Sequence, residues 1–224
     1  HQSRVAAGPW AGCSLHELWT THRRAVFGDG GRQPHAERFP VLVKILDCRD
    51  DLSIQVHPPA RVAATHGGEP KTEMWFVAHA EPAARLWAGL EGEVSRDAFE
   101  RGLAKGAVAS LVHQLSPMAG DSLFVRSGRV HALGAGLVVF EIQQNSDTTY
   151  RVFDWNRVGL DGKPRELHVE KSLASIDFND FETVLVSWQS SEAGGVAVRP
   201  LAQCEFFTVR QFTVQSGANV ALEA

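Results

Sequence analysis

Short strand-like runs recur along most of this 224-residue chain, and they constrain its fold more than any other feature. Each run is rich in Val, Ile, Phe or Trp, and Gly, Pro or Asp separates it from the next one. Many short strands with turn residues between them are typical of a β-sandwich or a β-barrel. The runs are FPVLVKIL, LSIQV, EMWFVAHA, ARLWAGL, DSLFV, GLVVFEIQQ and TTYRVFDW.

Three segments with helical patterns are expected to flank the β structure. In CSLHELWTTHRRAVFG, Ser14 stands three residues before Glu17, which forms a capping box, and Gly28 is a plausible stop. In SRDAFERGLAKG, Ser95 is the expected cap. The third segment is ELHVEKSLASI, at residues 166–176. We therefore expect a mainly β chain with a few helices.

A second β-rich section is expected towards the end of the chain. ETVLVSWQ and EFFTVRQFTV are predicted to be strands, and the SSEAGGVAV stretch between them is predicted to be a flexible turn region. About two strands are too few to close a sheet of their own. We therefore place a division between residues 1–178 and residues 179–224.

Composition excludes several kinds of partner. A formal net charge of -4 and a pI near 6.2 give no general attraction to nucleic acid or to an anionic membrane. No apolar run reaches the roughly 18 residues that span a bilayer. The cysteines, Cys13, Cys48 and Cys204, are odd in number and form no C-x-x-C pair, so we expect no disulfide framework and a cytoplasmic location.

The segment LSIQVHPPA combines a strand pattern with an unusual polar face. Side chains alternate across a strand, so Ser53, Gln55 and His57 share one face while apolar residues occupy the other. Two prolines follow at once. Such a segment is either an edge strand with a wet face or a strand whose polar face binds a ligand.

Further polar residues suggest a ligand set for a divalent metal ion. Lys71 and Glu73 share a face just before an apolar strand, and His131 lies in the glycine-rich segment SGRVHALGAG. His57, Glu73 and His131, with Gln55 beside them, form a two-His, one-carboxylate set that leaves room for water or substrate. In a chain with 10 histidines the same set can also arise by chance, with each member packed or solvated.

Four segments together resemble the signature segments of class I mannose-6-phosphate isomerase in its shorter bacterial form. They are LSIQVHP, KTEMWF, GRVHALG and EIQQNSDTTYRVFDWNR, and they stand in the family's order at compatible separations. The resemblance implies a cupin, a jelly-roll β-barrel, with one zinc ion per chain. Residues 1–178 would be the catalytic cupin domain with helical decorations, and residues 179–224 the start of a second, incomplete cupin-like β section.

The resemblance also assigns roles to residues of this chain. The metal ligands would be His57, Glu73, His131 and, as the least secure of the four, Gln55. The catalytic residues would be Arg151, Lys71 and Glu141. The substrate-binding residues would be Ser53 and Lys44. Either Glu141 or Lys71 could be the general base, and the sequence does not choose between them.

The chain departs from the family pattern beside its ligands. Arg126, Ser127, Gly128 and Arg129 stand where the family usually has P-A-G-T, and Pro58-Pro59-Ala60 stands where P-D-D is common. These changes affect the expected shape of the pocket and substrate preference more than metal binding.

The resemblance implies that the chain interconverts mannose 6-phosphate and fructose 6-phosphate through a cis-enediol, with a phosphosugar as its small-molecule partner. Two other classes remain open. An iron-dependent oxygenase would usually have its carboxylate close to the first histidine, which Glu73 is not. A non-catalytic sugar-binding or regulatory cupin would be expected to lack Arg151 or a metal ligand.

Overall fold

The computed structural model of the chain describes residues 3–28, 36–159, 162–186 and 190–221. They fall into two compact units: one comprises Val43–Ser187, and the other comprises His1–Leu42 with Trp188–Ala224. The predicted division at residue 178 remains a prediction. All residues expected at the functional site lie in the Val43–Ser187 unit, which we call the barrel unit.

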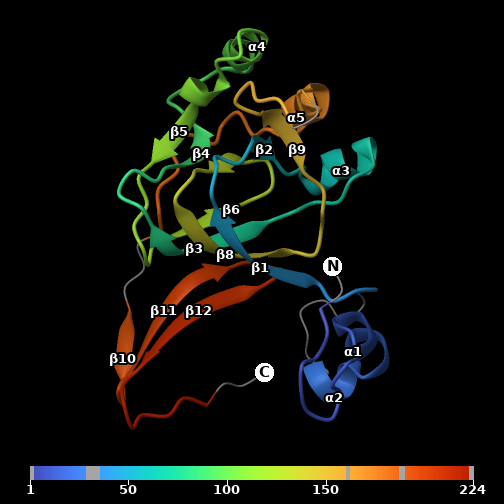
Figure 1. Cartoon of the computed structure of the whole chain (residues 1–224), viewed down its shortest axis with the longest axis vertical. Coiled ribbons are helices and arrows are strands. Elements are labelled where there is room, and N and C mark those ends of the chain that lie inside the picture. Colours follow the sequence, from blue (N-terminus) through green and yellow to red (C-terminus); the bar gives the residue numbers. More distant parts are fainter. Residues whose placement is uncertain (1–2, 29–35, 160–161, 187–189, 222–224) are drawn as a thin grey trace. The chain divides into compact units, whose positions relative to one another are not determined.

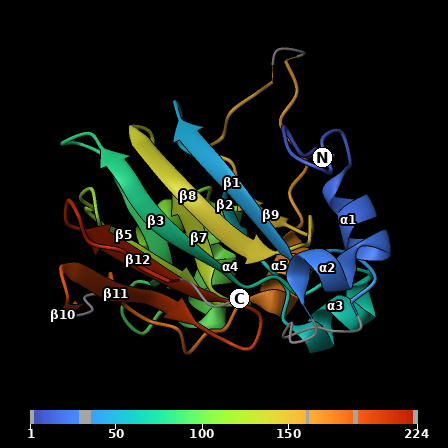
Figure 2. The same cartoon turned by 90° about the horizontal axis from the view of Figure 1, so that it is seen from below.

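Two antiparallel sheets form the barrel unit (Figure 1). One sheet has the strand order β1-β8-β3-β6, and the other has the order β5-β4-β7-β2-β9. The first consists of β1 (Val41–Cys48), β8 (Leu137–Gln144), β3 (Glu73–Ala80) and β6 (Ser122–Val125). The second consists of β5 (Val112–Leu115), β4 (Leu86–Leu90), β7 (Val130–Leu133), β2 (Ile54–Val56) and β9 (Tyr150–Phe153). In Figure 2, β1, β8 and β3 lie side by side as one layer.

The two sheets enclose an apolar core at one part of the barrel. Trp75 and Leu137 from the four-stranded sheet belong to the same buried cluster as Leu86 and Leu133 from the five-stranded sheet. Because strand side chains alternate between faces, only every second residue enters this core. Two facing antiparallel sheets of this kind are the jelly-roll arrangement expected from the sequence.

A second core covers the outer face of the five-stranded sheet. Ile54 and Val56 of β2 pack in one buried cluster with Phe99 of α4 (Arg96–Ala104) and Val108 of the 3-10 helix η1 (Val108–Leu111). Leu173 of α5 (Val169–Ser175) packs against the same cluster. Strand β2 is therefore buried on both faces. It also lies between β7 and β9, so the edge-strand interpretation is wrong.

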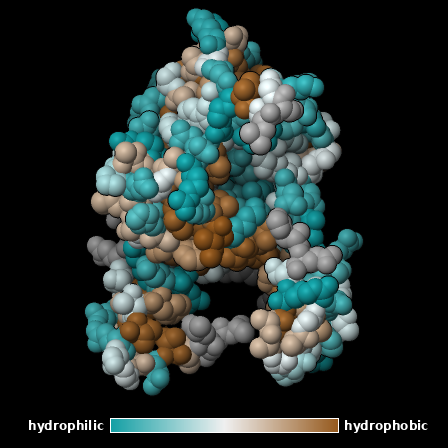
Figure 3. Space-filling view, viewed as in Figure 1, coloured by the Kyte–Doolittle hydropathy of each residue, from teal (hydrophilic) through white to brown (hydrophobic). Residues whose placement is uncertain are grey.

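The outer face of the four-stranded sheet carries exposed apolar side chains. Val43 and Ile45 of β1 are 59% and 66% exposed, and Phe140 of β8 is 38% exposed. Figure 3 shows hydrophobic atoms gathered where Figure 1 places β1 and β8. Alternation along β1 turns Lys44 and Leu46 to the opposite, inner face.

The helices follow the sequence predictions in part. Ser95 caps α4 through a hydrogen bond from the Ala98 backbone N–H, as predicted. The third predicted helix is present as α5, which begins at Val169. Helix α3 (Ala60–His66) was not predicted. Pro59 is its N-cap and has the extended backbone typical of that position, and Gly67 in the left-handed conformation is its C-cap.

The other compact unit contains helices α1 (Leu15–Thr21) and α2 (Arg23–Phe27) and a three-stranded antiparallel sheet. The single helix predicted here is present as two helices, because the helical conformation is interrupted at His22. The predicted capping box of Ser14 and Glu17 is present. The sheet has the order β10-β11-β12, with β10 (Ser191–Ala193), β11 (Val196–Gln203) and β12 (Thr208–Val214).

Two predictions for the end of the chain fail. The predicted flexible stretch SSEAGGVAV is instead the hairpin of β10 and β11, with Gly194 and Gly195 in its turn. The predicted strand ETVLVSWQ is absent over residues 182–186, and its remaining residues 187–189 lie outside the described part. No helix in the described residues is long and apolar enough to span a bilayer. No disulfide joins the described cysteines.

Candidate metal centre

Strand pairing aligns three of the predicted site residues across the five-stranded sheet. Gln55 of β2 lies opposite His131 of β7 on one side and opposite Arg151 of β9 on the other. Residues directly opposite each other in an antiparallel ladder point to the same face. This row therefore brings Gln55, His131 and Arg151 together on the inner face of the sheet.

The other two predicted metal ligands join His131 at the inner face. His57 follows the end of β2, and Glu73 is the first residue of β3 in the opposite sheet. One ligand atom from each of His57, Glu73 and His131 lies within 4.8 Å of the other two. His57 Nε2 is 3.3 Å from Glu73 Oε2, and His131 Nε2 is 3.5 Å from Glu73 Oε1. All three residues have 0% exposure.

Backbone carbonyl groups fix the orientation of both imidazole rings. His57 Nδ1 lies 3.0 Å from the Thr148 carbonyl oxygen, and His131 Nδ1 lies 2.9 Å from the Arg129 carbonyl oxygen. A carbonyl oxygen can only accept, so each Nδ1 carries the proton and donates it. Each Nε2 therefore points its lone pair toward Glu73, which is the tautomer that metal-binding histidines need.

Three atoms of this cluster are buried without a hydrogen bond. Among the described residues, His57 Nε2 and both carboxylate oxygens of Glu73 have no hydrogen-bond partner of suitable geometry. Buried polar atoms are rarely left in this state unless water or an ion completes them. Two imidazole nitrogens and one carboxylate are also ligands that zinc and related divalent metals prefer. The residues present therefore fit a bound divalent cation.

The charges in the cluster suit the same interpretation. Burial raises the pKa of Glu73, but neighbouring His57 and Lys71 outweigh burial and hold that pKa well below its usual range. Burial lowers the pKa of His131 to about 3, so its ring is neutral near pH 7. An ionised carboxylate beside a neutral imidazole is the protonation state that metal ligation requires.

Gln55 stands next to the three ligands. Its side-chain Nε2 lies 3.2 Å from His131 Nε2. Because His131 Nδ1 carries the proton, its Nε2 accepts from the Gln55 side-chain NH2 group. Gln55 is therefore within reach of the centre, and its ligand role remains a prediction.

A second polar cluster lies beside the metal centre on the four-stranded sheet. Lys71 Nζ is 2.9 Å from Glu73 Oε2. Lys44 Nζ of β1 donates to Glu141 Oε1 at 3.1 Å and to Gln143 Oε1 at 2.7 Å. Burial, followed by the negative charge of Glu73, raises the pKa of Glu141. The structure thus brings Lys44, Lys71 and Glu141 to the same inner region.

Arg151 and Ser53 complete the predicted set. Arg151 Nη1 donates to the Glu166 carbonyl oxygen at 2.7 Å, and its backbone N–H donates to His168 Nδ1 at 3.0 Å. Ser53 is 6% exposed and precedes β2. His168, to which the sequence analysis gave no role at the site, therefore fixes the backbone of the strand that carries Arg151.

Several neighbours of the centre received no role from the sequence. Gln143 has 0% exposure and lies opposite Glu73 in the β3–β8 ladder. Trp75 donates through Nε1 to Glu141 Oε2 at 3.3 Å, and its ring centroid is 5.4 Å from that of His131. Alternation along EIQQ places Gln143 on the same face as Glu141, so the sequence could have predicted that Gln143 lies near the site. The carbonyl groups of Thr148 and Arg129 carry no sequence signal, because any residue supplies one.

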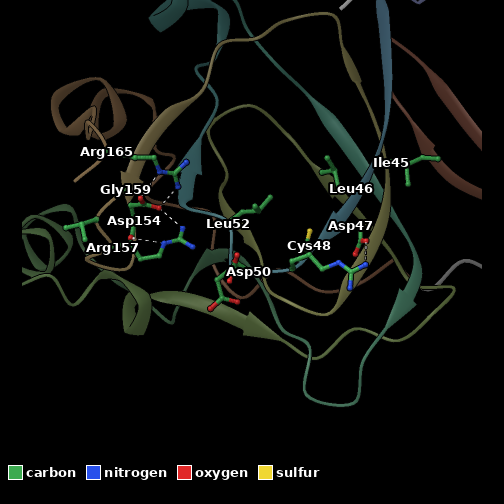
Figure 4. A pocket seen from close by; sticks show the side chains of 13 residues that line it. Ile45, Leu46, Asp47, Cys48, Asp50, Leu52, Asp154, Arg157, Gly159 and Arg165 are labelled. Carbon is green, nitrogen blue, oxygen red and sulfur yellow. Dashed lines mark hydrogen bonds and ion pairs between the residues drawn. The ribbon is translucent and has the colours of Figure 1, made fainter. Parts of the chain in front are cut away.

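One cavity of about 530 Å³ lies elsewhere in the barrel unit (Figure 4). Residues 45–52 line one side of it, and Asp154, Arg157, Gly159 and Arg165 are among the residues on the other. Asp154 accepts from Arg157 Nη2 at 2.6 Å and from Arg165 Nε at 2.7 Å. None of the predicted site residues lines this cavity, so it is not the metal centre.

Comparison with known proteins finds the same family in sequence profiles and in individual relatives. A sequence profile described as "Phosphomannose isomerase type I, catalytic domain" matches residues 1–71. Mannose-6-phosphate isomerase ManA of Bacillus subtilis (strain 168) is 36% identical over 222 residues, which cover 98% of this chain and 68% of the relative. The mannose-6-phosphate isomerase of Streptococcus mutans is 36% identical over 219 residues, covering 97% and 67%.

A solved structure matches in the same way. The crystal structure of the mannose 6-phosphate isomerase from Bacillus subtilis superposes with a TM-score of 0.85 at 34% identity, covering 96% of this chain and 67% of that chain. The match confirms the cupin fold expected from the sequence. This chain spans about two thirds of the length of these relatives.

Proposed function

Because this chain belongs to the mannose-6-phosphate isomerase family, we propose that it interconverts mannose 6-phosphate and fructose 6-phosphate with the help of one bound zinc ion. The observation that carries the proposal is the buried set of His57, Glu73 and His131, in which His57 Nε2 and both Glu73 carboxylate oxygens have no hydrogen-bond partner among the described residues. Gln55 would be a weaker fourth ligand.

The reaction moves one proton between carbon atoms of the sugar. A base removes the proton from C2 of open-chain mannose 6-phosphate, which leaves a cis-enediolate. O1 takes up a proton to give the cis-enediol, and the proton from C2 is then returned at C1 while the O2 hydroxyl releases its proton to give the ketone. Negative charge develops on a sugar oxygen during this transfer. A divalent cation held by His57, Glu73 and His131 supplies Lewis-acid stabilisation of that charge.

Arg151 is proposed to stabilise the same negative charge on the sugar oxygen through its guanidinium group. Its guanidinium group is permanently charged and can donate two parallel hydrogen bonds to neighbouring oxygens. Nη1 donates to the Glu166 carbonyl oxygen, and Nε is buried with no hydrogen-bond partner among the described residues. That Nε–H is a donor that a sugar oxygen could satisfy.

Glu141 is the better candidate for the general base. It is not a member of the ligand set, and burial raises its pKa toward the range that suits a base near neutral pH. Lys71 Nζ already forms an ion pair with Glu73, and an ammonium group has no lone pair with which to take a proton. We therefore assign proton transfer to Glu141 and a substrate-binding role to Lys71.

Lys44, Lys71 and Ser53 are proposed to hold the phosphate and hydroxyl groups of the substrate. The side chain of Lys44 is 31% exposed, whereas that of Lys71 is 5% exposed. A half-exposed lysine beside a buried one can meet an anionic sugar as it enters. The phosphate then anchors the sugar, so that binding energy from a remote group places C1 and C2.

The test is kcat/KM for mannose 6-phosphate against free mannose, measured together with the zinc content. Losing the phosphate removes charge-assisted hydrogen bonds of about 1.5–3 kcal/mol each, so we expect at least a tenfold preference for the phosphosugar. Comparable values would contradict the phosphosugar assignment. Sugar phosphate binding without turnover, in protein that holds zinc, would favour the alternative of a non-catalytic sugar-binding cupin.

A further inference from the structure

The turn between β6 and β7 contacts all three ligand segments. This turn, residues 126–129, is where the chain departs from the family pattern. The Gly128 backbone N–H donates to the His57 carbonyl oxygen at 2.8 Å. Ser127 Oγ donates to the Lys71 carbonyl oxygen at 3.0 Å, two residues before Glu73. One short turn therefore holds the backbone of two ligand segments.

The same turn holds the third ligand through its ring. The Arg129 carbonyl oxygen accepts the hydrogen bond from His131 Nδ1 that sets the ring's tautomer and orientation. Partners of this kind on metal-binding histidines affect metal affinity by about 10- to 100-fold. The position of the Arg129 backbone is therefore part of the geometry of the centre.

The side chain of Arg129 is anchored to a distant segment. Nε donates to Asp180 Oδ2 and Nη2 to Asp180 Oδ1, each at 2.8 Å, and Nη1 donates to the Phe124 carbonyl oxygen at 2.5 Å. Arg129 is 14% exposed and Asp180 is 7% exposed at the side chain. Asp180 is itself held, because its carbonyl oxygen accepts from the Leu90 backbone N–H at 2.7 Å.

Arg126 adds a weaker link to the same segment. Its Nη1 donates to Asp177 Oδ2 at 2.8 Å, and its Nη2 lies 3.1 Å from Asp180 Oδ1. The side chain of Arg126 is 43% exposed, so solvent weakens these contacts. The buried bidentate contact between Arg129 and Asp180 is therefore the principal anchor of the turn.

We propose that Asp180 is a positioning residue for the metal centre and acts through Arg129 on His131. This inference rests on the proposed function, in which the centre binds a divalent cation. Without Asp180, the guanidinium group of Arg129 would keep only the Phe124 carbonyl oxygen and would move toward solvent. The Arg129 carbonyl oxygen would then no longer hold the His131 ring in one orientation.

The experiment compares zinc affinity among the full-length wild type, Asp180→Ala and Asp180→Asn. Zinc is titrated in competition with a chelating dye, and Co²⁺ is substituted so that its visible absorption reports ligand geometry. We expect Asp180→Ala to bind zinc about 10- to 100-fold more weakly and to alter the Co²⁺ spectrum. Asp180→Asn keeps the shape and one oxygen, so its loss should be smaller.

Two control variants separate positioning from stability. Asp154, like Asp180, is 7% exposed at the side chain and accepts from two arginines, but among the described residues no hydrogen bond or ion pair joins its side chain to a ligand segment. Asp154→Asn should lower thermal stability and leave zinc affinity and the Co²⁺ spectrum unchanged. Arg126→Ala removes the weaker link only, so it should change zinc affinity by less than threefold.

The outcomes distinguish a failure of the Asp180 positioning role from a failure of the proposed function. Equal zinc affinity in the wild type and Asp180→Ala would overturn the positioning role and leave the proposed function intact. A wild type that binds no zinc would overturn both. If the Asp180 variants do not fold, Arg129→Lys decides the question, because lysine keeps the charge but cannot form the paired contact. Wild-type affinity in Arg129→Lys would contradict the inference.

Discussion

Arg151 lies directly opposite Gln55 in the β2–β9 ladder, and Gln55 in turn lies opposite His131. Neighbouring strands are about 4.8 Å apart, so the backbones of Arg151 and His131 are separated by about 10 Å on one face. Gln55 occupies the position between them and lies 3.2 Å from His131 Nε2. The pairing register therefore fixes the order of the candidate ligand His131, Gln55 and the guanidinium-bearing Arg151 across one face of the sheet.

Arg151→Ala should retain zinc and the fold but lose most of its turnover, because Arg151 is proposed to meet charge that develops in the transition state. We expect kcat to fall by about 10²- to 10³-fold, the usual effect of losing one such donor, with a smaller change in KM. Arg151→Lys should restore only part of the rate. Zinc loss or unchanged turnover in Arg151→Ala would argue against this role.

Replacing His57 or His131 by Ala should remove zinc and activity together, because a three-residue ligand set tolerates no loss. Glu73→Gln, which keeps the side-chain volume, should have the same effect. His79, exposed on the same strand as Glu73, is the control, and His79→Ala should keep its zinc. Elemental analysis after dialysis measures the outcome, and a fully loaded His131→Ala protein would refute the ligand assignment.

Glu141→Gln should abolish most of the turnover while zinc is retained, because the amide keeps the shape but cannot take a proton. General-base catalysis contributes about 10²- to 10⁴-fold, which is the expected fall in kcat. Lys71→Met removes the ion-pair partner of Glu73 and should instead change zinc affinity. Wild-type kcat in Glu141→Gln would move the base to another residue.

The pH dependence of kcat/KM gives a separate check on Glu141. Burial raises its pKa above the ordinary value of 4.5, so a base at this position loses activity as the pH falls through that raised value. We therefore expect the acid limb of the profile to lie above pH 4.5 at constant zinc occupancy. An acid limb that persists unchanged in the residual activity of Glu141→Gln would exclude Glu141 as its source.

Asp154 should contribute stability at neutral pH that disappears in acid. Hydrogen bonds from Arg165, and then from Arg157, lower the pKa of Asp154 from 3.8 to about 2. The folded carboxylate therefore binds a proton less readily than the unfolded one, so its contribution is complete above pH 3.8 and is lost as the pH falls to about 2. Melting temperatures of the wild type and Asp154→Asn should differ at pH 6 and converge near pH 2.

The polar face of β2 shows how far alternation predicts this site. The two-residue period correctly separated Gln55 and His57 from Ile54 and Val56, because a buried strand must sort its side chains between two faces. It could not show that Ile54 and Val56 are covered by α4 and η1, which makes both faces buried. That fact depends on segments far away in the sequence.

The grouping of Glu73 with the two histidines followed from the family resemblance, since spacing alone left it open. Glu73 belongs to the other sheet, and only closure of the barrel brings it to His57 and His131. The failed strand at residues 182–186 shows the opposite case. Val184 and its neighbours have a strand composition, but Val184 is 75% exposed, and residues 182–186 form no strand although Glu182 and Val186 each donate one backbone hydrogen bond to a strand, at Leu90 and Ser122. Composition does not supply a pairing partner.

The division of the ligands between the two sheets has a consequence for how the protein folds. A cation bound by Glu73 on one side and by His57 and His131 on the other ties the sheets together as a cross-link does. Its ligands are far apart in the sequence, so this cross-link can form only after slow, non-local strand pairing is nearly complete. Zinc would then bind only the folded barrel and stabilise it by mass action. It would not direct the earlier steps of folding.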